Sequence, residues 1–205
     1  MAAALAAALI GAMIFGAAAT CGIFAANAVL PKLQGFEDGP PGVDFPPAAL
    51  IGGAAVIGAV MGFRTPPLDQ LVITAIVTVC LVAIWYCDAK TGIIPDVFTL
   101  VPLGLLVIYG FVQHDPMVLA SAAIMFVPFA VLAFISKGRG MGWGDAKLAA
   151  LGGALLGVSG ATVAFVVASL AAALAAWLKY RSRNAPIALG PYLVAAIAAS
   201  LPFTF

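Results

Sequence analysis

Charged residues are scarce in this sequence. They make up 8% of its 205 residues, whereas soluble domains carry about 25%. A water-soluble domain with so few charges would lack the polar surface that keeps it dispersed. Together with a mean hydropathy of +1.18, this scarcity indicates an integral membrane protein. The net charge is only +1, so no basic excess favours a nucleic-acid partner, and the expected surroundings are the lipid bilayer.

Histidine and cysteine are also rare, which excludes several kinds of site. His114 is the only histidine, so the H-E-x-x-H zinc motif is absent and a Ser–His protease would have to use that residue. The three cysteines, Cys21, Cys80 and Cys87, form no C-x-x-C pair. The pattern therefore predicts neither a zinc knuckle nor a redox pair, and we expect no metal and no cofactor.

Long apolar runs dominate what remains. A helix needs about 20 apolar residues to cross a bilayer, and secretory signal peptides begin with basic residues. The first basic residue here is Lys32, so we expect the first run to be a retained membrane helix. The sequence predicts one integral-membrane domain, 1–205, an all-α polytopic bundle of about eight segments: 3–30, 48–63, 70–87, 96–113, 117–136, 145–158, 161–179 and 187–201.

The basic residues predict an orientation. If the loop 88–95 is cytoplasmic, eight of the nine basic residues lie in cytoplasmic loops, and Arg64 alone falls on the other side. Cytoplasmic loops carry an excess of Lys and Arg. We therefore expect a multi-pass protein of the cytoplasmic (inner) membrane with both chain ends, and so the N-terminus, outside.

Asp88 and Asp145 lie at the ends of two predicted segments on the cytoplasmic side. An ionisable side chain at the centre of a membrane helix costs about 2.5–3.5 kcal/mol, so carboxylates at a membrane edge indicate a function. Two carboxylates held close together do not easily both ionise, which leaves one charged and one protonated. A charged Asp that takes a proton from water, beside a neutral Asp that donates to a scissile carbonyl, is the pair that an aspartyl protease needs.

The residues around Asp145 fit this chemistry. Gly142 and Gly144 lack Cβ, so the backbone can adopt unusual dihedral angles and a substrate strand can pass close by. Asp145 at a helix start feels the positive end of the helix dipole, and Lys147 follows two residues later. We therefore expect Asp145 to be the ionised member of the pair.

Simpler structural roles are also compatible with these aspartates. Asp145 could cap its helix and Asp88 could be a polar helix end at the membrane interface. Asp96 follows Pro95 and is expected to be the N-cap of the segment 96–113.

Two stretches resemble the type IV prepilin peptidases, which are GxGD-type intramembrane aspartyl proteases: DAKTGIIPDVFTL at 88–100 and GMGWGDAKLAALGGALLG at 140–157. Weaker similarity extends to 22–33 and 186–196. The resemblance implies that Asp88 and Asp145 are the catalytic pair, that no metal takes part, and that the substrates are prepilins or pseudopilins of pilus or secretion systems. Their leader peptides would be cut at the cytoplasmic membrane face.

The loop 31–47, PKLQGFEDGPPGVDFPP, departs from the pattern of many bacterial members. Those members carry two C-x-x-C pairs in a long loop at this place, linked to N-methylation of the new terminus. Here the loop contains no cysteine, so we expect peptidase activity without N-methyltransferase activity. Its acidic residues, Glu37, Asp38 and Asp44, are hypothesised to attract the basic leader, although a merely solvated loop is equally compatible with the sequence.

Two other functions remain open at the level of sequence. One is a catalytically idle assembly protein of a pilus or secretion machine. The other is a small proton-coupled transporter that uses Asp88 and Asp145 as its site, because intramembrane carboxylates suit that role equally well.

Overall fold

The computed structural model describes residues 2–33, 46–137, 141–180 and 189–203. Every regular element in these ranges is helical, which confirms the all-α prediction. The elements are α1 (Ala2–Leu33), α2 (Pro47–Arg64), α3 (Leu68–Thr91), α4 (Asp96–Val112), α5 (Met117–Ile135), α6 (Trp143–Tyr180), α7 (Gly190–Ser200) and the short 3-10 helix η1 (Leu201–Phe203).

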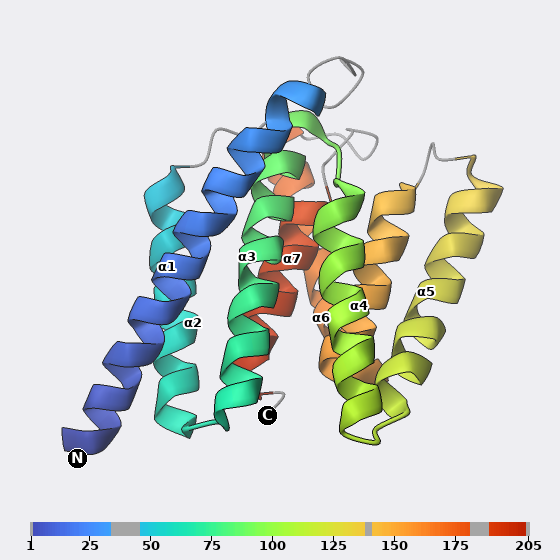
Figure 1. Ribbon diagram of the computed structural model, residues 1–205. Helices are drawn as coiled ribbons and strands as arrows, with labels where there is room; N and C mark the ends of the chain where they lie inside the picture. The colour runs from blue at the N-terminus through green and yellow to red at the C-terminus, as the bar shows by residue number, and fades with distance from the viewer. Residues whose placement is uncertain (1, 34–45, 138–140, 181–188, 204–205) are drawn as a thin grey trace.

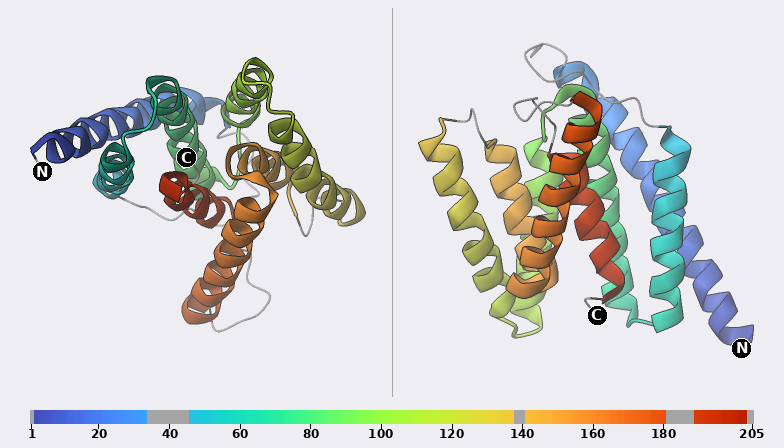
Figure 2. Two further views of the ribbon diagram at one scale, coloured as in Figure 1. Left: turned by 90° about the horizontal axis from the view of Figure 1, so that it is seen from below. Right: turned by 180° about the vertical axis from the view of Figure 1, so that it is seen from behind.

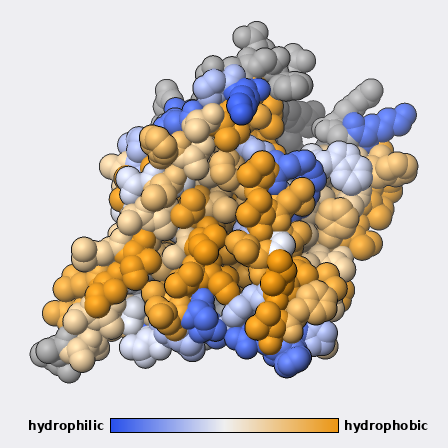
Figure 3. Space-filling view, in the orientation of Figure 1, coloured by the Kyte–Doolittle hydropathy of each residue, from blue (hydrophilic) through white to orange (hydrophobic). Residues whose placement is uncertain are grey.

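Five of these helices, namely α1, α2, α3, α5 and α6, are long and apolar enough to cross a membrane. Helices α4 and α7 are apolar but shorter. Large hydrophobic side chains cover the outside of the bundle; Phe24, Ile108 and Leu170 are 79%, 62% and 65% exposed. Figure 3 shows hydrophobic residues across the middle of one face and hydrophilic residues toward its upper and lower ends. The chain is therefore a multi-pass membrane protein.

Prolines and left-handed residues set the helix boundaries. Pro46, Pro67, Pro95 and Pro116 occupy the N-cap positions of α2 to α5; proline lacks an N–H, and its fixed φ suits a helix start. Helix α3 ends at Gly92, whose φ is 67° and whose N–H bonds to the Asp88 carbonyl, because glycine adopts this left-handed conformation without strain. The helix thus runs past the predicted end at residue 87.

Helix α6 contains a break. At Gly157 the backbone has φ 70° and ψ 173°, which is not helical and separates two helical parts. The boundary predicted between the segments 145–158 and 161–179 lies within two residues of Gly157. Only glycine adopts such a conformation readily, so the glycine at position 157 favours a break in the helix at this point.

Helix α3 lies in the middle of the bundle and packs against α1, α4 and α7. Figure 1 places α1 and α2 on one side of α3 and α4, α5 and α6 on the other, and Figure 2 shows α7 behind it. The C-terminal end of α3 and the N-terminal ends of α4, α6 and α7 lie at the same end of the bundle. Fully buried side chains from three of these helices form the core, among them Ile84 of α3, Leu148 of α6 and Ile197 of α7. The acidic residues of the loop 31–47 lie outside the described residues.

Candidate active site

Asp88 lies in the last turn of α3, within the helix rather than after it. Its side chain is only 5% exposed. The buried oxygen Oδ2 has no hydrogen-bond partner among the described residues, although the backbone N–H of Gly190 approaches the carboxyl group. A buried polar atom without a partner costs free energy, about 1–3 kcal/mol for a neutral group. A buried, unpartnered oxygen at one end of a membrane bundle points to a functional role.

Asp145 lies in the first turn of α6 and is partly buried. Its Oδ2 accepts a hydrogen bond of 3.2 Å from the backbone N–H of Gly142, three residues earlier. A side chain that reaches back in this way resembles the returning half of a capping box. Asp145 therefore does take part in capping the start of α6, by reaching back to the N–H of Gly142. Its other carboxylate oxygen does not take part in this hydrogen bond.

The two aspartates come together in space. Gly190, which lies against the Asp88 carboxyl, and Gly144, the residue before Asp145, both pack against Ile94, so the two aspartates border one cluster although Asp88 belongs to α3 and Asp145 to α6. This meeting follows from the fold, because the end of α3 and the start of α6 share one end of the bundle. Repulsion between like charges at short range disfavours ionisation of both.

Ile94 lies between the glycines that border the pair. A Cβ atom added to Gly144 would be 2.9 Å from the Ile94 Cβ, and one added to Gly190 would be 3.3 Å from its Cδ1. A Cβ on Gly190 would also overlap Asp88 Oδ2. Close packing at these two positions therefore requires glycine. Four segments meet here: the end of α3, the connection to α4, and the starts of α6 and α7.

The reason for the glycines differs in part from the prediction. Among the described glycines, positive φ angles occur at Gly92 and Gly157, not at Gly142 or Gly144. The expectation of unusual dihedral angles at Gly142 and Gly144 was not met, because neither residue has a positive φ. Gly144 is needed for its close approach to Ile94, while a Cβ on Gly142 would make an ordinary contact of 3.5 Å with Asp145.

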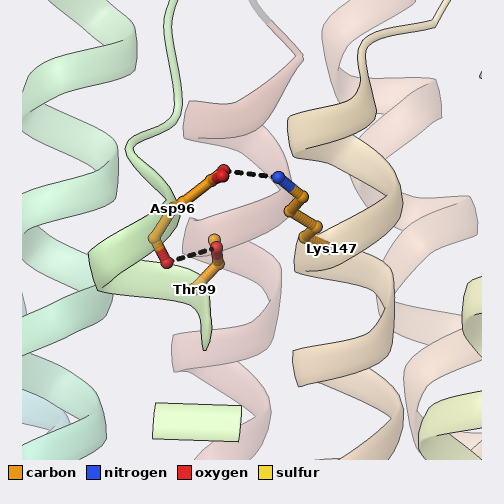
Figure 4. Close-up of polar contacts among 3 residues, drawn as sticks. All are labelled: Asp96, Thr99 and Lys147. Atoms are coloured by element: carbon orange, nitrogen blue, oxygen red, sulfur yellow. Dashed lines mark hydrogen bonds and ion pairs between the residues drawn. The ribbon is translucent and has the colours of Figure 1, made fainter. Parts of the chain in front are cut away.

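Lys147 forms an ion pair with a different carboxylate from the one beside it in sequence. Its Nζ lies 2.5 Å from Asp96 Oδ1 at the start of α4, as Figure 4 shows. Lys147 was expected to favour the charged form of Asp145, and this effect stays a prediction, while the direct partner of Lys147 is Asp96 because the start of α4 lies against α6. Asp96 is not the N-cap: Pro95 holds that position, and the carbonyl of Asp96 accepts a bond from Thr99.

Gly190 and Ile94 belong to this site and were not identified as site residues from the sequence. The pair Gly190-Pro191 reads as an interruption near a helix start, and a glycine is a residue that lets another group approach the backbone closely. Ile94 carried no signal, because an isoleucine between two apolar segments is ordinary.

Other polar residues lie at the opposite end of the bundle. Asp69 Oδ2 accepts hydrogen bonds from the Tyr109 hydroxyl at 2.8 Å and from the Gln113 amide at 3.2 Å. Asp115 accepts a bond from the N–H of Met117, and His114 sits in the turn with φ 57°. Within the described ranges, no three His, Cys, Asp or Glu side chains gather where they could hold a metal ion.

Comparison with known proteins places the chain in a family. The sequence model of the type IV leader peptidase family matches residues 75–177, a range that contains Asp88, Ile94, Asp145 and Lys147 and ends before Gly190. The prepilin leader peptidase/N-methyltransferase of Neisseria gonorrhoeae is 34% identical over 125 residues, which cover 58% of this chain and 44% of the relative. No solved structure matches significantly. With half of the chain matched by the family, the resemblance found in the sequence is confirmed, and this protein belongs to the type IV leader peptidase family.

Proposed function

We propose that this protein is an intramembrane aspartyl endopeptidase that removes the leader peptide of prepilins or pseudopilins, with Asp88 and Asp145 as its catalytic pair. The observation that carries the proposal is that these two aspartates, from different helices, border one cluster around Ile94, and that Asp88 Oδ2 is buried with no hydrogen-bond partner among the described residues. Family membership supports the substrate class, since the relative from Neisseria gonorrhoeae is a prepilin leader peptidase.

The surroundings of the two aspartates support different roles. Asp145 accepts the N–H of Gly142, as an ionised carboxylate does, and is proposed to take a proton from the attacking water. Asp88 Oδ2 has no donor among the described residues, which suits a protonated carboxyl that gives its own hydrogen to the scissile carbonyl oxygen. Water then adds to the carbonyl carbon. The C–N bond breaks as the proton that Asp145 took from water passes to the leaving amine. No covalent intermediate with the enzyme forms.

The proposed topology has the catalytic pair facing the cytoplasm. Four described basic residues lie at the end of the bundle that holds the pair: Lys32, Lys90, Lys137 and Lys147. Arg64 lies at the other end, where its guanidinium sits 5.5 Å from the Phe203 ring centroid. The excess of positive charge on one side favours that side as cytoplasmic. With α6 counted as two crossings on either side of Gly157, the chain crosses the inner membrane eight times and its N-terminus is outside.

The proposed activity does not include N-methylation. The loop 31–47 has seventeen residues and no cysteine or histidine, so it lacks the means to build a metal-supported pocket for a methyl donor. The mature pilin made by this enzyme in cells without other such peptidases is expected to carry an unmodified amino terminus, which intact-mass measurement tests. An added methyl group would contradict this part of the proposal.

The central test replaces each aspartate with its amide. Asp88→Asn and Asp145→Asn keep the side-chain shape but cannot exchange the protons, so each is expected to abolish cleavage of a purified prepilin in detergent or vesicles. Asp69→Asn is the matched control, because it makes the same change at the far end of the bundle and should leave kcat/KM within about two-fold of wild type. Membrane insertion and thermal unfolding should be similar in all three variants. Cleavage near the wild-type rate by either of the first two would refute the catalytic pair.

A further inference from the structure

A groove lies between α2, α3 and α7 and has a volume of about 190 Å³. Figure 2 shows from behind how α2 and α7 flank α3. Its lining is apolar and mostly small on two sides, with Gly53 and Ala54 from α2 and Ala195 and Ala198 from α7. Gly53 and Ala195 are exposed, so the groove opens at the surface of the bundle and is not an internal void.

On α3, the wall of the groove leads to the candidate active site. Thr78, Leu81 and Trp85 line the groove, and the next residue in this series is Asp88. Their spacing of three, four and three residues places all four on one face of the helix. Asp88 lies ten positions after Thr78, which corresponds to about 15 Å along the helix axis.

On α7, the opposite wall leads to the same place. Leu201 at the start of η1 and Ala198 and Val194 of α7 line the groove. The next residue on that face is Gly190, which lies against the Asp88 carboxyl. The lining of the groove stops one helical turn before Asp88, at Trp85 on α3 and Val194 on α7. The same helix faces continue to Asp88, whose Oδ2 has no hydrogen-bond partner among the described residues. The helix faces that line the groove therefore run over about three helical turns toward the candidate catalytic pair.

The chemistry of this path restricts what can occupy it. A peptide whose scissile bond reaches Asp88 must place the residues on one side of that bond beside the bundle at membrane depth. Unpaired backbone groups are costly there, so the segment must be helical. Its side chains must be apolar to match the lining. Small residues such as Gly53 and Ala198 allow a helix to approach closely, because membrane helices associate through close packing.

We propose that the groove between α2, α3 and α7 binds an apolar helix of the substrate, about ten residues long and directly adjoining the scissile bond. The inference rests on the proposed peptidase function. In this arrangement the groove aligns the substrate helix along α3 and α7, and the peptide bond at the end of that helix meets Asp88 and Asp145.

Two neighbouring glycines of α2 provide a matched test. A Cβ added to Gly53 or to Gly52 would meet no atom within 4 Å, so a larger side chain fits at either position without a clash. Gly53 lines the groove and Gly52 does not. Gly53→Leu should fill the groove and raise KM for a full-length prepilin about 10- to 100-fold, the equivalent of one buried leucine contact. Gly52→Leu should stay within about two-fold of wild type.

The outcomes separate the groove from the peptidase function. If the wild-type protein cleaves prepilin and both leucine variants behave alike, whether both active or both impaired, the groove does not bind the substrate. If the wild-type protein cleaves no prepilin at all, the proposed function itself fails. A rise in KM confined to Gly53→Leu supports the inference.

Photocrosslinking identifies the occupant directly. A photoreactive residue at position 53 of the inactive Asp145→Asn variant should form an adduct with prepilin in vesicles, and one at position 52 should not. Mass spectrometry of the adduct distinguishes prepilin from phospholipid. Adducts with phospholipid alone, in the presence of excess prepilin, would overturn the inference.

Discussion

Replacing Gly190 with alanine tests how closely the fold controls the position of Asp88. In most helices this change is neutral or stabilising, by about 0.5–1 kcal/mol in the interior. Here the new Cβ would overlap Asp88 Oδ2 and lie 2.8 Å from its Cγ, whereas ordinary contacts begin at 3.4 Å. The carboxyl group must therefore move by at least about 0.6 Å, the difference between the two distances for Cγ, and Oδ2, which is closer, must move further.

That movement is expected to affect catalysis more than folding. The Asp88 side chain is 5% exposed, so it has little free space in which to turn. Overpacking of this kind costs about 1–3 kcal/mol of stability, which a folded bundle tolerates. A misplacement of about 1 Å in a catalytic group costs about 100-fold in rate. Gly190→Ala should therefore lower kcat for prepilin cleavage by about 30- to 100-fold and leave KM nearly unchanged.

Gly104→Ala on α4 is the matched control, because a Cβ there would meet no atom within 4 Å. It should retain wild-type kcat, and both variants should show cooperative thermal unfolding in detergent. Wild-type kcat in the folded Gly190→Ala variant would refute the reasoning, since it would mean that the position of the Asp88 carboxyl does not limit the reaction. Loss of folding in that variant would refute the claim that its effect is mainly catalytic.

Three further predictions follow from single contacts or residues. Lys147→Met should lower kcat/KM by about ten-fold because it releases the α4 start from α6. Stability should fall by less than about 1 kcal/mol because the ion pair is partly exposed. The swapped pair, Asp96→Lys with Lys147→Asp, should recover part of the activity, and no recovery would argue against the contact. Gly157→Ala places a side chain at φ 70° and should destabilise the protein by more than about 1 kcal/mol, measured by thermal unfolding; an unchanged Tm would contradict the break in α6. Neutralising the three acidic residues of the loop 31–47 should raise KM for a basic leader, with a smaller effect at high salt; a change that does not depend on salt would rule out attraction by charge.

Much of the candidate site could be found in the sequence because charge is so rare in it. Against long apolar runs, Asp88 and Asp145 stand out at segment ends, and the energetic cost of a carboxylate near the membrane gives each of them a reason to be there. The helical class followed from the same runs, since a membrane interior leaves the backbone few alternatives. Even the break at Gly157 fell within two residues of the predicted boundary.

The partners of these residues could not be found in this way. Lys147 lies two residues from Asp145 and was expected to favour its charged form; that Asp96, from the start of α4, lies 2.5 Å from Lys147 in the folded protein could not be predicted. Gly190 comes from α7 and Ile94 from the connection before α4, yet both border the aspartates. Such contacts depend on which helix ends share one face of the bundle and at what rotation about their axes.

The sequence alone determined the membrane environment, the helical class and the two candidate aspartates, because each depends on local composition and on the cost of charge in an apolar medium. Tertiary structure decided the ion pair, the glycine contacts and the groove between α2, α3 and α7. These features arise where side chains from different helices pack against each other, and in a membrane that packing depends on close steric fit. A hydropathy pattern fixes which segments become helices, but steric fit between surfaces distant in sequence selects which faces meet.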